Sequence, residues 1–180
     1  MRLNCEPERA RLYRVRPNGE VCTLREGLTI ANGLAWDLGR ERFYHIDSPR
    51  KTIDVFRWPD LKLLNSITGL LDEIQPLIPG TPVVRNGLEI DLVGRLWVAT
   101  YGGGKVLCVD PAGAKIVTDV VVPEAAKVTR CCFGGAEKKT LFIATIREAP
   151  IDLETYPDSG SIFKIELDSP AVSPPYRFKV

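Results

Sequence analysis

A motif that recurs three times along the chain limits the folds that it can adopt. Each copy has an opening segment followed by short apolar runs that are rich in β-branched and aromatic residues. The copies open at Asn32-Gly-Leu-Ala-Trp-Asp37, Asn86-Gly-Leu-Glu-Ile-Asp91 and Thr129-Arg-Cys-Cys-Phe-Gly134. Apolar runs of this length between turn residues predict β-strands. Repeated units of several strands, about 40 to 55 residues long, are typical of β-propeller blades.

The runs that follow each opening segment come in the same order in all three copies. They are Arg42–Asp47 and Thr52–Phe56, then Arg95–Thr100 and Lys105–Asp110, then Thr140–Thr145 and Ser161–Ile165. The 15 glycines and 14 prolines break the chain between them, and no stretch has the pattern of a long amphipathic helix. The sequence therefore predicts an all-β fold. A β-sandwich remains the alternative, because a sandwich does not require repeats.

We interpret residues 1–180 as a single, incomplete β-propeller domain. The blade-like units cover approximately residues 32–60, 86–113 and 129–167, and a partial unit covers 10–24. We expect the spacers 61–84 and 148–160 to be loops on a propeller face. About three complete blades and a fragment do not close a ring, because propellers have about four to eight blades. Unclosed blade edges favour pairing, so self-association is a possible outcome.

Composition excludes several classes of function. The chain has 24 Lys and Arg against 23 Asp and Glu, a net charge of +1, which argues against a nucleic-acid binder. No apolar run approaches the ~20 residues that cross a membrane, and the N-terminus has no hydrophobic segment typical of a secretion signal. The five cysteines form no C-x-x-C pair, so we expect reduced thiols in a cytoplasmic protein. His45 is the only histidine, and we expect it to be structural.

Taken in order, these motifs resemble the regucalcin (senescence marker protein)/gluconolactonase family. The resemblance rests on the segments 31–37, 43–48, 86–99, 102–106, 131–135, 141–145 and 160–165, and extends from about residue 10 to Pro175-Tyr176. It is greatest to the regucalcin branch. It implies a six-bladed propeller, of which this chain would correspond to roughly the C-terminal three-fifths, without the N-terminal blades.

The resemblance also implies a function. Family members bind one divalent metal in the central channel and hydrolyse sugar lactones, so the expected partner is a small sugar lactone. The expected metal is Ca²⁺, with Zn²⁺, Mn²⁺ or Mg²⁺ as alternatives. By resemblance, Asn32 and Asn86 occupy two metal-ligand positions. An amide oxygen is a suitable ligand for Ca²⁺. The third ligand of the family, a Glu of the first blade, has no counterpart here.

Asn86 departs from the family pattern, because Arg85-Asn-Gly87 stands where Pro-Asp-Gly is usual. An amide cannot accept the proton that a carboxylate could, and it adds no charge. The sequence therefore predicts a site with neutral ligands only, weak metal binding and slow or absent hydrolysis, with no catalytic residue identified. Asn-Gly is also a common turn dipeptide, which is the alternative reading of both asparagines. Glu89 and Asp91 could substitute as carboxylates, but alternation should turn them away from Asn86. The alternative function is an inactive, truncated propeller that binds metal or a partner.

Overall fold

Four antiparallel sheets make up the computed structural model, which describes residues 6–149, 151 and 153–168. Cys5 and the Pro175-Tyr176 region lie outside the described residues. The described elements, in chain order, are β1 (Ala10–Val15), β2 (Val21–Leu28), β3 (Ala31–Asp37), β4 (Arg42–Asp47), the 3-10 helix η1 (Ser48–Arg50), β5 (Thr52–Arg57), β6 (Leu63–Ile67), β7 (Val84–Ile90), β8 (Leu96–Tyr101), β9 (Lys105–Asp110), β10 (Lys115–Val121), β11 (Val128–Gly134), β12 (Thr140–Thr145) and β13 (Ile162–Glu166).

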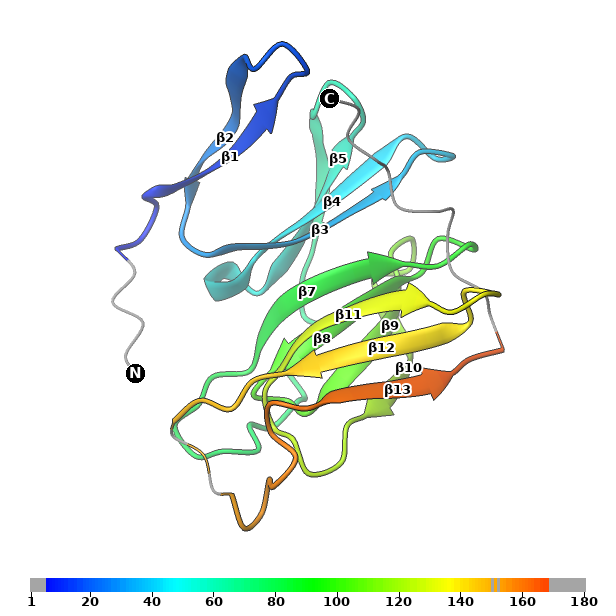
Figure 1. Ribbon diagram of the computed structural model, residues 1–180. Helices are drawn as coiled ribbons and strands as arrows, with labels where there is room; N and C mark the ends of the chain where they lie inside the picture. The colour runs from blue at the N-terminus through cyan, green and yellow to red at the C-terminus, as the bar shows by residue number, and fades with distance from the viewer. Residues whose placement is uncertain (1–5, 150, 152, 169–180) are drawn as a thin grey trace.

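The sheets follow one another along the chain as blades do in a propeller (Figure 1). Their strand orders are β1-β2, β3-β4-β5-β6, β7-β8-β9-β10 and β11-β12-β13. The first strands of the last three sheets are neighbours, since β7 contacts both β3 and β11. The predicted all-β class and partial propeller are confirmed. No helix within the described residues has the length and apolar character needed to cross a membrane.

One part of the predicted loop at 61–84 is a strand. Leu63–Ile67 forms β6, the outer strand of its sheet, and pairs with β5. Only Ile67 in this strand is buried, and the four residues before it are exposed. Because only one side chain of this outer strand is buried, its sequence shows almost no alternation of apolar and polar residues. The sequence pattern therefore did not predict it.

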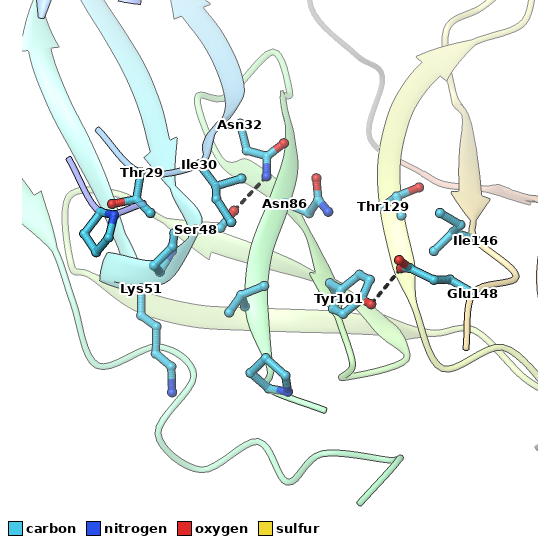
Figure 2. A pocket seen from close by; sticks show the side chains of 14 residues that line it. Thr29, Ile30, Asn32, Ser48, Lys51, Asn86, Tyr101, Thr129, Ile146 and Glu148 are labelled. Atoms are coloured by element: carbon cyan, nitrogen blue, oxygen red, sulfur yellow. Dashed lines mark hydrogen bonds between the residues drawn. The ribbon is translucent and has the colours of Figure 1, made fainter. Parts of the chain in front are cut away.

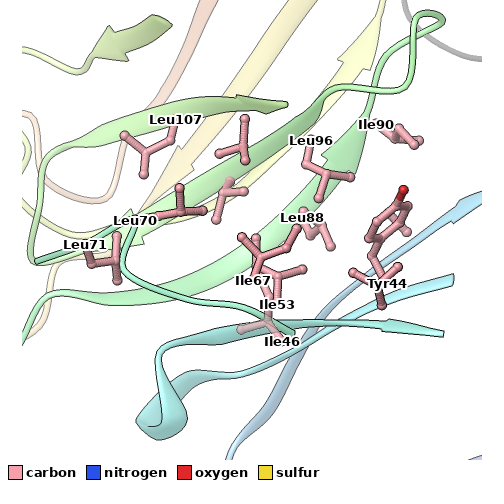
Figure 3. Packing of buried hydrophobic residues seen from close by; sticks show 14 of the residues in the cluster. Tyr44, Ile46, Ile53, Ile67, Leu70, Leu71, Leu88, Ile90, Leu96 and Leu107 are labelled. Carbon is pink, nitrogen blue, oxygen red and sulfur yellow. The ribbon is translucent and has the colours of Figure 1, made fainter. Parts of the chain in front are cut away.

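The largest hydrophobic core lies between the β3–β6 and β7–β10 sheets (Figure 3). Alternation along β4 and β5 turns Tyr44, Ile46, Ile53 and Val55 into it, where they meet Leu88 and other residues of the next sheet. A second core, which includes Trp97, Val128 and Leu141, joins the β7–β10 sheet to β11–β13. Each buried Ile, Leu or Val side chain contributes about 1.5–3 kcal/mol. These two cores fix the three sheets relative to one another.

The opposite face of the β3–β6 sheet packs against the β1–β2 hairpin through polar groups. Arg25 of β2 forms an ion pair of 3.2 Å with Asp54 of β5, and its guanidinium lies 5.2 Å from the centre of the Phe56 ring. His45 of β4 is fully buried here, and neither ring nitrogen has a hydrogen-bond partner among the described residues. Burial lowers the pKa of His45, and the nearby carboxylates of Asp54 and Asp47 oppose that shift.

Candidate functional site

A pocket of about 690 Å³ opens where the three innermost strands begin (Figure 2). Most of its wall comes from the starts of β3, β7 and β11 and from the ends of the strands paired with them. The described residues that line it are Pro7, Thr29, Ile30, Asn32, Ser48, Pro49, Lys51, Pro82, Val84, Asn86, Tyr101, Thr129, Ile146 and Glu148. Both predicted metal ligands, Asn32 and Asn86, therefore line the same pocket.

Three of these residues occupy one repeated position, a bulge in the innermost strand of each sheet. The β3–β4 register shifts between Ala31 and Leu34, the β7–β8 register between Arg85 and Leu88, and the β11–β12 register between Val128 and Arg130. At each shift the innermost strand has one residue more than its partner. A bulge re-aims the side chain it carries. Asn32, Asn86 and Thr129 lie at these shifts, and all three line the pocket.

A second repeated position contributes to the same wall. Ser48 directly follows β4, Tyr101 ends β8, and Ile146 directly follows β12. Each lies at the end of the second strand of its sheet, and each lines the pocket. When the three copies of the sequence motif are aligned, these residues fall in one column. That alignment is the signal that could have identified them from sequence alone.

The two asparagines are held in strands and not in turns. The glycine that follows each one allows the neighbouring sheet to approach. A Cβ on Gly33 would lie 2.7 Å from the carbonyl oxygen of Asn86, and one on Gly87 would lie 2.8 Å from that of Thr129. Both distances are too short for any side chain. Asn18-Gly19, by contrast, forms the β1–β2 turn, where Gly19 has a φ of 81°.

A chain of two hydrogen bonds orients the Asn32 amide. Its Nδ2 donates to Ser48 Oγ at 2.8 Å, and the Ser48 hydroxyl donates to the carbonyl oxygen of Arg85 at 2.5 Å. Because the amide nitrogen is used by Ser48, Asn32 Oδ1 points away from that hydroxyl (Figure 2). Asn32 therefore uses one N–H on Ser48 and leaves its oxygen available to a ligand in the pocket.

Glu148 adds a carboxylate to the pocket that the sequence did not predict there. Its Oε2 accepts a 2.9 Å hydrogen bond from the Tyr101 hydroxyl, and its backbone carbonyl accepts one of 2.6 Å from Lys127 Nζ. Burial is the main cause that raises the pKa of Tyr101 to about 12, and the hydrogen bond to Glu148 is the second. The pocket therefore contains a carboxylate in addition to the two predicted ligands, while the prediction that the metal ligands themselves are neutral stays a prediction. Glu148 was assigned to a loop outside the repeats, so alignment of the repeats could not identify it.

The two carboxylates considered as substitutes lie elsewhere. Neither Glu89 nor Asp91 is among the described residues that line the pocket. Asp91 accepts hydrogen bonds from the Arg95 guanidinium at 2.8 Å and the Trp97 indole at 3.1 Å, which fixes the β7–β8 turn. Burial raises the pKa of Glu89, and a hydrogen bond from the Ile90 amide opposes that shift.

A buried cation directly precedes the pocket residue Asn86 in the sequence. Arg85 precedes Asn86 in β7, and its side chain is fully buried. None of its three guanidinium nitrogens has a hydrogen-bond acceptor among the described residues. Burial lowers the pKa of Arg85 to about 10, and the carboxylate of Asp72 opposes this shift. Arg85 is therefore a buried positive charge, adjacent in sequence to one of the two predicted metal ligands, and the charge of Asp72 offsets part of its desolvation.

The donor set of the pocket suits a hard cation. Amide, hydroxyl and carboxylate oxygens are the ligands that Ca²⁺ and Mg²⁺ take, and the described lining contains no thiol or imidazole. Within the described residues, no group of three or more His, Cys, Asp or Glu side chains could hold a metal ion. Asn32 and Asn86 remain the predicted ligands of a metal in this pocket.

Comparison with known protein families gives a match over most of the chain. Residues 1–147 match the family model described as SMP-30/Gluconolactonase/LRE-like region. The chain is 32% identical over 176 residues to the putative sugar lactone lactonase YvrE of Bacillus subtilis (strain 168). The matched region covers 94% of this chain and 57% of that protein. It is 33% identical over 177 residues to regucalcin of Oryctolagus cuniculus, covering 96% of this chain and 57% of the relative.

Comparison with solved structures supports the fold. The calcium-binding protein regucalcin from Agrobacterium tumefaciens str. C58 superposes with a TM-score of 0.79 at 20% identity, over 96% of this chain and 58% of the other. At that identity the likeness shows the fold alone. The chain thus spans a little more than half the length of the relatives that it matches.

Proposed function

Because the chain belongs to the SMP-30/gluconolactonase/LRE-like family, we propose that it hydrolyses a sugar lactone, an aldonolactone, in the pocket lined by Asn32 and Asn86. The observation that carries the proposal is that both asparagines lie at equivalent bulges of adjacent innermost strands and line one pocket. One relative, by its name, points the same way, since it is a putative sugar lactone lactonase.

A divalent metal, Ca²⁺ in the first place, is part of the proposal. Asn32 and Asn86 would hold it through their amide oxygens, and when bound it would polarise the lactone carbonyl. The solved relative described as calcium-binding supports a divalent ion. The contribution of this chain is to fix the Asn32 amide through Ser48, so that its oxygen is available for binding.

The pocket also has the size and lining that a sugar lactone requires. Its volume of about 690 Å³ falls within the range of about 300–1,000 Å³ typical of small-molecule sites. The hydroxyls of Thr29 and Thr129 and the ammonium of Lys51 can hydrogen-bond a polyol, while Ile30, Val84 and Ile146 exclude water from part of the wall. This combination of few polar groups on an apolar wall orients a small ligand.

Hydrolysis of an aldonolactone by the purified chain tests the proposal. Each turnover releases an acid, so pH-stat titration follows the rate above the spontaneous background. We expect a Ca²⁺-dependent rate that the double variant Asn32→Ala/Asn86→Ala abolishes. Asn18→Ala is the matched control, because Asn18 also precedes a glycine but lies in the β1–β2 turn. A rate no higher than background for the wild type contradicts the proposal. Ca²⁺ binding without hydrolysis would then favour a non-catalytic binding protein.

A further inference from the structure

Lactone hydrolysis needs a group that accepts the proton of the attacking water, and the pocket offers one candidate. Three of the described lining residues are ionisable: Lys51, Tyr101 and Glu148. The Lys51 ammonium holds a proton at neutral pH and has none to accept. Tyr101 is a neutral phenol that already donates its hydrogen to Glu148. The carboxylate of Glu148 is therefore the one lining group with both the charge and the lone pairs for this role.

Glu148 is also held in a defined position. The segment that leaves β12 is fixed first by the amide of Ile146, which donates to the carbonyl oxygen of Lys127 at 3.0 Å. Two residues later, Lys127 Nζ donates to the carbonyl oxygen of Glu148 at 2.6 Å. Lys127 in turn forms an antiparallel bridge with Tyr101 at the end of β8. These contacts fix the backbone just before Glu148 and at Glu148 itself.

The side chain of Glu148 is restrained by a further hydrogen bond. Tyr101 donates to Oε2 at 2.9 Å, and Figure 2 shows the carboxylate facing this hydroxyl inside the pocket. That bond uses one lone pair of one oxygen, which leaves Oε1 able to accept a hydrogen bond from water. Lys127 Nζ lies 5.4 Å from the centre of the Tyr101 ring, in a cation–π contact that restrains the phenol. Tyr101 and Lys127 are thus positioning residues for the carboxylate.

We propose that Glu148 is the proton acceptor for the water that opens the lactone ring, an inference that rests on the proposed hydrolysis. The water oxygen forms a bond to the carbonyl carbon as its proton moves to Glu148. Collapse of the tetrahedral intermediate breaks the bond between that carbon and the ring oxygen. The proton held by Glu148 passes to the leaving ring oxygen, which becomes a hydroxyl. One lactone and one water give one hydroxy acid, and Glu148 returns to its ionised form.

The polar and charged groups around Glu148 include Tyr101, which ends β8, and Lys127, which lies between β10 and β11. Lys51 lines another part of the pocket, from the connection between η1 and β5. Lys127 and Lys51 are cations, and Lys127 is fully buried. Burial lowers the pKa of Lys127, and Glu148 opposes that shift. The carboxylate is thus the negative member of a group whose other charged members are positive.

Chemical rescue tests the assignment. Glu148→Ala should lower kcat/KM for the aldonolactone by about 10²- to 10⁴-fold, the usual contribution of a general base. Added formate should restore part of kcat in this variant in proportion to its concentration. Formate should leave the wild type unchanged. Glu137→Ala removes an exposed carboxylate in the β11–β12 turn and is the matched control, which should keep full activity.

Two further variants separate catalysis from folding. Glu148→Gln keeps an oxygen for the Tyr101 hydrogen bond, so it should fold like the wild type by circular dichroism and still lose activity. Tyr101→Phe removes the hydrogen bond that positions the carboxylate, so it should lower kcat, but by a smaller factor than Glu148→Ala. The assignment is overturned if Glu148→Gln keeps activity within about threefold of wild type, or if formate does not rescue the activity lost in Glu148→Ala. In either case the proposed lactone hydrolysis stands. A wild type that hydrolyses no lactone overturns the proposed function, and this role with it.

Discussion

Gly33 of one innermost strand lies against Asn86 of the next, so closely that a Cβ on Gly33 would be 2.7 Å from the Asn86 carbonyl oxygen and 2.6 Å from the Leu88 Cβ. The Asn-Gly pairs at 32–33 and 86–87 therefore do two different things. The asparagine occupies a bulge and faces the pocket, while the glycine lets adjacent sheets approach. The approach of β3 to β7 and of β7 to β11 is what brings the pocket residues together.

Gly33→Ala should destabilise the protein, because the methyl group must displace the backbone of β7. Overpacking of this kind costs about 1–3 kcal/mol. Urea unfolding followed by tryptophan fluorescence measures the change in the free energy of unfolding. Gly39→Ala is the control, since its nearest new neighbour would be the Asp37 carboxylate at 3.6 Å, an ordinary contact. Equal stability of Gly33→Ala and the wild type would contradict the close packing of the two strands.

The family resemblance predicted that Asn32 and Asn86 belong to one site. The repeats agree with it, because repeated motifs in adjacent blades put equivalent residues on equivalent strands. Glu148 could not, because it lies outside the motif and reaches the pocket through contacts with Lys127 and Tyr101. Side-chain contacts between distant segments leave no periodic pattern, so they have to be read from the structure.

Asn86→Asp should strengthen divalent metal binding by the pocket. The substitution adds a negative charge at a bulge that faces the pocket, and Ca²⁺ affinity rises with the number of charged ligands. We expect a gain of about tenfold or more in the Ca²⁺ association constant, which corresponds to about 1.4 kcal/mol. Isothermal titration calorimetry measures it. Asn18→Asp makes the same change in the β1–β2 turn and should leave the Ca²⁺ affinity unaltered. An equal gain in Asn18→Asp would show that the added net charge, and not its place in the pocket, raises the affinity.

Stability should fall as the pH drops below about 6.5, through His45. Its pKa is lowered in the folded protein, so between that value and the unfolded pKa of about 6.5 the unfolded chain takes up a proton that the folded chain does not. The contribution of neutral His45 to the free energy of unfolding is complete above pH 6.5. It is lost as the pH falls, by at most about 1.4 kcal/mol per pH unit. His45→Leu should flatten the dependence between pH 7.5 and 5.5, measured by urea unfolding.

The same prediction can be checked directly on the imidazole. His45 is the only histidine in the chain, so its ring protons can be followed by NMR titration without assignment of other residues. A folded pKa at or above 6.5 would contradict the effect of burial. It would show that the carboxylates of Asp54 and Asp47 outweigh desolvation.

Arg85→Met should leave the free energy of unfolding unchanged or raise it. The guanidinium is fully buried and its three nitrogens have no acceptor among the described residues, so its desolvation is offset only in part, by the charge of Asp72. Replacing a buried ionic group with an apolar side chain of similar volume is neutral or stabilising by about 1–4 kcal/mol. The pKa of Arg85 is lowered to about 10, which is consistent with burial that disfavours its charged form. Urea unfolding at pH 7.5 compares the variant with Arg16→Met, which removes an exposed arginine of the β1–β2 hairpin. A loss of more than about 1 kcal/mol in Arg85→Met alone would show that acceptors stabilise the guanidinium, since breaking a compensated buried charge is destabilising.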